Sequence, residues 1–168
     1  IKSKQHMLLI KNFCEIAQGN WELWIAGDGP ERSNLETLIN KEKLTCKVKL
    51  LGNVSDIDSL YQKVQVFAFS SKSEGFPNAL GEAMSAGLAS IAYDCPAGPS
   101  DLIQHEQNGF LISIGDEESY RRCLQSLMGE PQLREKLGLE AQKSIRQHQS
   151  MKIIGKRFEK LMLGEDIN

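Results

Sequence analysis

Apolar residues along this chain follow two spacings, one typical of helices that cover a core and one typical of buried strands. Near the start, Leu8, Leu9, Phe13 and Ile16 recur at helical spacing and predict a helix over 7–17. Short, nearly continuous apolar runs predict strands that are buried on both faces. The predicted strands cover 21–26, 47–51, 64–69, 88–93 and 110–112. Further helices are predicted at 30–43, 57–63, 78–86, 100–104, 117–128, 131–149 and 151–163.

The alternation of strands and helices defines the fold class. Short turns between the elements predict a parallel sheet with helices on both faces, which is a doubly wound, Rossmann-like α/β fold. The chain has 168 residues and no repeat or low-complexity linker, so it fits a single domain over 1–168. An open parallel sheet normally starts with a strand, whereas this chain starts with a helix. We therefore expect a fragment of a longer protein, with a strand directly upstream.

Composition and charge exclude several classes of function. The 20 Lys and Arg residues nearly balance the 22 Asp and Glu residues, and the formal charge of -2 argues against a nucleic-acid-binding surface. The 4 Cys residues form no C-x-x-C pair and lie apart from the His residues, so neither a zinc site nor a disulfide framework is predicted. No apolar run approaches the about 20 residues that a membrane-spanning helix needs, and no signal-peptide pattern opens the chain. A cytoplasmic protein without a membrane span is expected.

The strongest candidate chemistry lies in the segment SEGFPNALGEAMSAG, which carries Glu74 before a predicted helix and Glu82 inside it. Pro77 suits the first turn of a helix, because a proline lacks the N–H that would be unpaired there. The amides of the next three residues, Asn78, Ala79 and Leu80, are then expected to be free at the positive end of the helix dipole. Such an end binds phosphate, and the two carboxylates could bind sugar hydroxyls on either side of it.

The other candidate loops also follow predicted strands. These loops are 27–29, 52–54, 70–76 and 94–99. Ligands of doubly wound sheets bind at the carboxyl ends of the strands, so the topology predicts that the loops converge on one site. The Gly27 to Arg32 stretch lacks the third glycine of a G-x-G-x-x-G fingerprint, which argues against a nicotinamide dinucleotide.

Five motifs in order make the chain resemble the retaining glycosyltransferases of family 4, which have the GT-B fold and a Glu-x7-Glu signature. The motifs are the Lys4 helix, WELWIAGDGP, KVKLLGNV, VFAFSSKSEGF with the Glu82 helix, and CPAGPSDLIQHEQNGFLI. The resemblance covers nearly the whole chain and identifies it as the donor-binding half of a GT-B fold, without the N-terminal acceptor domain. The sequence departs from the family at Ala89 and Ser90, where proline and an aliphatic residue are usual.

The resemblance implies a role for each candidate residue. Glu74 would be catalytic and would orient the donor sugar, together with the amides of Gly75 and Phe76. Glu82 would accept hydrogen bonds from both ribose hydroxyls, and Lys4 would neutralise the diphosphate. The remaining donor contacts would come from the backbone of Gly27, Gly29, Gly52, Val54, Asn78, Ala79 and Leu80. The alternatives are that the glutamates and Lys4 are ordinary surface residues and that the glycines only form turns.

By this resemblance the protein is a hexosyltransferase that moves a sugar from a UDP- or GDP-sugar to a glycan or lipid-linked acceptor, in bacterial surface polysaccharide synthesis. No cofactor and no metal are implied, and the isolated fragment is expected to bind a nucleoside diphosphate without transferring sugar. The full-length protein could also lie peripherally at the inner face of the membrane. The alternatives are a noncatalytic nucleotide-sugar-binding module and a phosphorylase or epimerase relative with the same fold.

Overall fold

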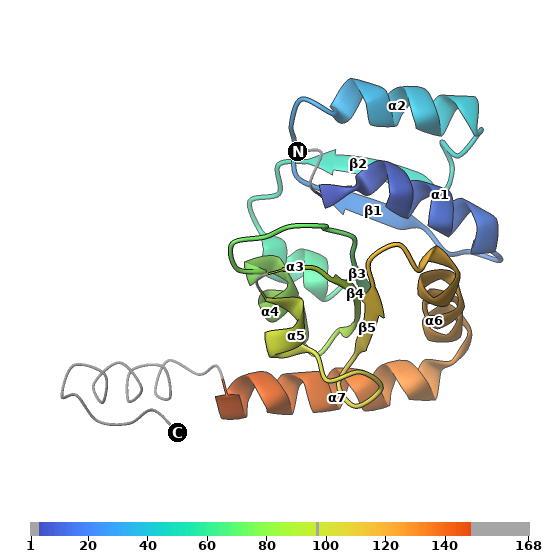
Figure 1. Cartoon of the computed structure of the whole chain (residues 1–168). Helices are drawn as coiled ribbons and strands as arrows, with labels where there is room; N and C mark the ends of the chain where they lie inside the picture. Colours follow the sequence, from blue (N-terminus) through green and yellow to red (C-terminus); the bar gives the residue numbers. More distant parts are fainter. Residues whose placement is uncertain (1–3, 97, 149–168) are drawn as a thin grey trace.

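The computed structural model describes residues 4–96 and 98–148, which form five strands and seven helices (Figure 1). The strands are β1 (Leu23–Ala26), β2 (Val48–Gly52), β3 (Val66–Phe69), β4 (Ala89–Asp94) and β5 (Phe110–Ser113). The helices are α1 (His6–Ile16), α2 (Arg32–Lys41), α3 (Ile57–Tyr61), α4 (Asn78–Ser85), α5 (Pro99–Leu102), α6 (Glu117–Gly129) and α7 (Pro131–His148). Every one of these elements overlaps a predicted one. The predicted helix over 151–163 lies outside the described residues.

All strand pairs in the described part of the chain are parallel, as predicted, but they form two sheets in place of one. β1 pairs with β2, and β3, β4 and β5 pair in that order. β1 and β3 do not pair with each other, and residues of both strands line one cavity. The expectation of one continuous sheet is therefore corrected to two parallel sheets whose open edges line the same cavity.

Helices cover both faces of the larger sheet, because successive side chains of its central strand point in opposite directions. Ile91 and Tyr93 of β4 pack in a core cluster with residues of α1 and α6, whereas Ala92 packs with residues of α4 and α5. Helix α7 packs along α4 and β4, at the bottom of Figure 1. This arrangement confirms the doubly wound architecture and leaves the carboxyl ends of the strands free for loops.

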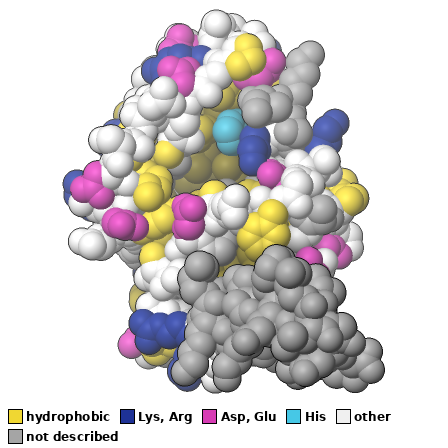
Figure 2. All heavy atoms as spheres, turned by 90° about the vertical axis from the view of Figure 1, so that its left-hand side faces the viewer, with side chains coloured by type: hydrophobic (Ala, Val, Ile, Leu, Met, Phe, Trp, Pro, Cys, Tyr) yellow, Lys and Arg dark blue, Asp and Glu magenta, His cyan; other side chains and the backbone are white. Residues whose placement is uncertain are grey.

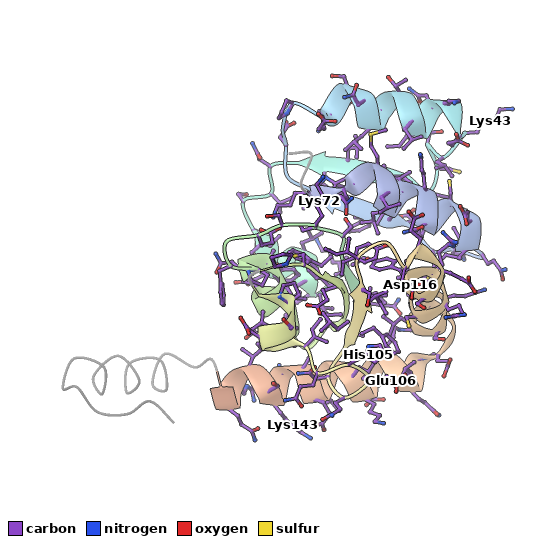
Figure 3. All side chains as sticks on the ribbon, viewed as in Figure 1. Lys43, Lys72, His105, Glu106, Asp116 and Lys143 are labelled. Atoms are coloured by element: carbon purple, nitrogen blue, oxygen red, sulfur yellow. The ribbon has the colours of Figure 1, made fainter. Side chains whose placement is uncertain are left out.

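Two aspartates fix the starts of helices as the sequence predicts. The Asp56 carboxylate accepts a hydrogen bond from the Ser59 N–H at 3.0 Å and caps α3. The Asp116 carboxylate, labelled in Figure 3 at the start of α6, accepts one from the Ser119 N–H at 3.0 Å. Ser90, which needs a partner inside a buried strand, donates its hydroxyl to the Leu88 carbonyl at 3.1 Å.

Candidate functional site

A cavity with a volume of about 860 Å³ lies between β1 and β3. It is a hollow with apolar walls and charged side chains at its rim (Figure 2). Of the residues predicted to bind the donor, its wall includes Lys4, Gly27, Gly29, Ala79 and Glu82. The convergence that the topology predicts is thus present in part, since these residues come from three separate segments: the residues before α1, the loop after β1 and the start of α4.

Lys4 and Glu74 form an ion pair at one side of this cavity. The Lys4 Nζ lies 2.6 Å from the Glu74 Oε1, and the Glu74 side chain is only 11% exposed. The Ser70 hydroxyl donates to the Lys4 carbonyl at 2.7 Å, which ties the residues before α1 to the end of β3. Lys4 also lies 5.6 Å from the centre of the Phe69 ring, a cation–π distance. These contacts argue against the reading of Lys4 as an ordinary surface lysine.

Glu82 lies about one turn inside α4, whereas Glu74 lies on the loop that precedes this helix. Its carboxylate Oε2 lies 3.3 Å from the hydroxyl of Tyr61, and the same hydroxyl lies 3.4 Å from the Ala79 carbonyl oxygen. Burial and the neighbouring Glu82 carboxylate raise the pKa of Tyr61 to about 12. At neutral pH the phenol is therefore protonated and donates to the carboxylate.

The start of α4 differs from the expectation of three free amides. The Asn78 N–H donates to the Phe76 carbonyl at 2.9 Å, and the Leu80 N–H donates to the Pro77 carbonyl at 3.0 Å. Pro77 has φ -83 and ψ 63, the conformation at the centre of an inverse γ-turn, so the chain closes a tight turn before the helix. Among the described residues, only the Ala79 N–H of these three lacks an acceptor. The prediction of free amides was wrong for Asn78 and Leu80 because the carbonyls of Phe76 and Pro77, at the turn before the helix, accept these two N–H groups.

The glycine loops meet at the ends of β1 and β2. The Gly27 N–H donates to the Gly52 carbonyl at 2.7 Å, and both glycines have positive φ, at 111° and 68°. The Gly29 N–H donates to the Asp28 carboxylate at 2.7 Å. Positive φ explains why the turn favours glycine at both positions, since side chains disfavour it.

Seven of the twelve residues predicted to bind the donor lie outside the cavity wall, namely Gly52, Val54, Glu74, Gly75, Phe76, Asn78 and Leu80. Gly52 is the last residue of β2 and the half-buried Val54 follows it, whereas Gly75 and Phe76 lie on the loop before α4. The Phe76 side chain is 51% exposed, next to the buried Pro77. The contacts proposed for these residues stay predictions.

Three residues that the sequence analysis did not single out belong to the site. Arg32 lines the cavity at the start of α2, and a Cβ added at Gly52 would lie 3.7 Å from its guanidinium. His6 also lines the cavity, and burial, together with the nearby charge of Lys4, lowers the pKa of its imidazole. Tyr61 is the third. In the sequence, these residues differ from others only in that each follows a predicted site residue or loop within a few positions.

Within residues 4–96 and 98–148, no three His, Cys, Asp or Glu side chains gather in a group that could hold a metal ion. A search of the same residues finds no helix with the length and apolar character to cross a membrane.

Parallel strands, helices on both faces and a cavity at the carboxyl ends place the protein in the class of Rossmann-like α/β domains. Residues 1–144 match the sequence model of the family "Glycosyl transferases group 1", and the chain belongs to this family. This family assignment agrees with the resemblance that the five sequence motifs carry.

Two relatives illustrate the range of the family. The GtfA subunit of a UDP-N-acetylglucosamine–peptide N-acetylglucosaminyltransferase from Limosilactobacillus reuteri subsp. suis is 39% identical over 103 residues, which cover 61% of this chain and 20% of the relative. The lipopolysaccharide core biosynthesis glycosyltransferase LpsD of Rhizobium meliloti is 30% identical over 154 residues, which cover 92% of this chain and 44% of LpsD. The chain thus spans less than half the length of either relative.

Solved structures share the fold. The S. aureus TarM structure with UDP, Fondaparinux and alpha-GlcNAc-glycerol superposes with a TM-score of 0.89 at 23% identity, over 95% of this chain and 33% of TarM. The pneumococcal O-GlcNAc transferase GtfA, solved with UDP and GlcNAc, gives a TM-score of 0.84 at 25% identity, over 96% of this chain and 33% of GtfA. These neighbours confirm the GT-B domain fold.

Proposed function

We propose that this chain is the donor-binding half of a retaining glycosyltransferase of family 4. The whole enzyme would move a sugar from a nucleoside diphosphate-sugar to a glycan or lipid-linked acceptor, which a separate N-terminal domain would bind at the cytoplasmic face of the membrane. Membership of the glycosyltransferase family supports this proposal. The observation that carries it is the convergence of Lys4, Glu82 and the glycine loop on one cavity, with Glu74 held beside it by its ion pair with Lys4.

Each charged group of the site has a proposed task. Glu82 accepts hydrogen bonds from the ribose hydroxyls, a task suited to an ionised carboxylate. Lys4 and the Ala79 amide neutralise the diphosphate, which gains charge when the bond to the sugar breaks. Glu74 binds hydroxyls of the transferred sugar. The Lys4–Glu74 ion pair must rearrange for this, because both groups neutralise each other at 2.6 Å in the structure.

Retention follows if the acceptor attacks on the same face of the sugar from which the diphosphate leaves. In that scheme the leaving phosphate accepts the proton of the acceptor hydroxyl, so the chain needs no nucleophile of its own. The residues of this half then act by holding the donor and stabilising the departing charge.

UDP is the nucleotide to test first. The TarM and GtfA neighbours were solved with UDP, and the HepE neighbour from Anabaena was solved with UDP-glucose. Relatives named for lipopolysaccharide core and amylovoran biosynthesis, LpsD and AmsD of Erwinia amylovora, support a role in bacterial surface polysaccharides.

Isothermal titration of the chain with UDP, GDP and ADP tests the proposal. We expect UDP to bind more tightly than the other two nucleotides. A Glu82→Ala variant with the same circular dichroism spectrum is the matched control and should bind UDP more weakly. A folded chain that binds none of the three nucleotides would refute the donor-binding function.

A further inference from the structure

Tyr61 is a buried aromatic residue that connects the loop after β2 to the first turn of α4. It is the last residue of α3 and is 7% exposed. Its ring meets the Phe67 ring edge to face at 6.3 Å and packs with Ala83 and Leu88 in one core cluster. The ring is therefore held on several sides, and its hydroxyl occupies a fixed place.

The hydroxyl of Tyr61 lies within hydrogen-bonding distance of two oxygen atoms of α4. Its oxygen lies 3.3 Å from the Glu82 Oε2 and 3.4 Å from the Ala79 carbonyl oxygen. A carboxylate can only accept hydrogen bonds, whereas a phenol can donate one. The Tyr61 proton is thus shared between a carboxylate and a helix carbonyl, and both acceptors belong to residues of the cavity wall.

Apart from this contact, Glu82 is exposed. A glutamate loses side-chain entropy when it is fixed, so an unsupported carboxylate would lose part of its binding free energy in ordering. A hydrogen bond to Oε2 from a buried, immobile donor removes much of that freedom before a ligand arrives. It leaves Oε1 free, because no other described side chain binds it.

We propose that Tyr61 is a positioning residue that holds the Glu82 carboxylate in place to receive the hydroxyl groups of a nucleotide ribose. The inference rests on the proposed function, since it names how the ribose-binding group is oriented. In this role Tyr61 acts through the Glu82 carboxylate.

The test compares UDP with 2′,3′-dideoxy-UDP, a ligand that keeps the base and diphosphate but lacks both ribose hydroxyls. Dissociation constants are measured by calorimetry for the unmodified chain, Tyr61→Phe, Glu82→Gln and the double variant. The Tyr61→Phe change keeps the ring and removes only the hydroxyl. Tyr120→Phe is the matched control, because Tyr120 is a fully buried tyrosine away from the cavity whose hydroxyl has no described partner. Melting temperatures verify that each variant is folded.

We expect Tyr61→Phe to weaken UDP binding by about fivefold, the order expected for one lost hydrogen bond, and to leave dideoxy-UDP binding unchanged. The double variant should bind UDP no more weakly than Glu82→Gln alone, because Tyr61 acts through that carboxylate. Tyr120→Phe should affect neither ligand.

Two results would overturn the inference while leaving the proposed function intact. One is a Tyr61→Phe chain that binds UDP like the unmodified chain although Glu82→Gln weakens it. The other is an equal loss for both nucleotides in Tyr61→Phe, which would indicate a purely structural role. If Glu82→Gln also binds both nucleotides like the unmodified chain, the ribose assignment itself is wrong, and the inference falls with it.

Discussion

The side chains of Lys4 and Glu74 neutralise each other across 2.6 Å at the carboxyl end of β3. Under the proposed function, a nucleoside diphosphate brings negative charge and would therefore compete with Glu74 for Lys4. In this exchange a bare nucleotide would form an ion pair with Lys4 but leave Glu74 without a partner. The sugar of a nucleotide-sugar could in addition donate hydrogen bonds from its hydroxyl groups to Glu74. The two carboxylates of the site are thus expected to respond to different parts of the donor.

Alanine substitutions should separate these two tasks. Glu82→Ala should weaken UDP binding by about 1–3 kcal/mol, because hydrogen bonds from the ribose to a charged group are lost. Glu74→Ala should leave UDP binding unchanged or slightly stronger, since Lys4 loses its competing partner, and should weaken only the binding of the UDP-sugar. Calorimetric titration of both variants with UDP and UDP-sugar measures the difference. Equal losses of UDP affinity in the two variants would contradict this division.

At the scale of the elements, apolar periodicity and capping residues predicted the ends of the described helices and strands to within one or two residues. Asp56 and Asp116 act by local hydrogen bonds that spacing alone reveals, so the starts of α3 and α6 were correct. The Pro77 turn was not predictable in the same way, because a proline suits both the first turn of a helix and an inverse γ-turn. The direct contact of Lys4 with Glu74 was not predicted, because an ion pair between distant segments leaves no local pattern in the sequence.

Tyr61 shows why some residues of the site could not be predicted from the sequence. A tyrosine at the end of a short helix is usually a packing residue, and its ring does pack against Phe67. Only the three-dimensional position of its hydroxyl, next to Glu82, distinguishes it from any other core aromatic.

The β4–α5 connection supports the start of α4 through one glycine. Gly98 has φ +134, and a Cβ added there would collide with the Pro77 ring. Gly98→Ala should destabilise the fold by more than the about 1–3 kcal/mol of backbone strain alone, and it should weaken UDP binding by shifting the α4 turn. Gly115→Ala is the control, because its φ is +90 but its Cβ would meet nothing within 4 Å. Urea unfolding of the two variants measures the difference, and equal losses would mean that the Pro77 contact is unimportant.

The start of α4 and Lys4 also lead to a prediction about metal ions. If the Ala79 amide and Lys4 neutralise the diphosphate, UDP binding should be unchanged by excess EDTA and by added magnesium or manganese. Higher salt should weaken it, because the Lys4 side chain is 35% exposed and its attraction is screened. The measurement is one titration repeated under each condition. An affinity that disappears with EDTA and returns with the metal would overturn this assignment.

At the scale of the whole molecule, the described residues form two groups of elements joined mainly through α1. One group contains β1, β2 and α2, and the other contains the β3–β5 sheet with the helices around it. Helix α1 contacts α2 and β1 on one side and α6 on the other. The open edges of β1 and β3 face the same cavity, so no strand pairing connects the groups within the described part of the chain.

This divided sheet has a consequence for how the molecule opens. Segments that lack pairing across a boundary tend to unfold as separate cooperative units, which native-state hydrogen exchange detects. Amides of β1 and β2 should therefore exchange faster than those of β4, which has neighbours on both sides. UDP would contact the glycine loop of the first unit and the carboxylates of the second, so saturating UDP should slow exchange most in β1 and β2. Protection that is equal in both sheets, with and without UDP, would show that the domain opens only as a whole.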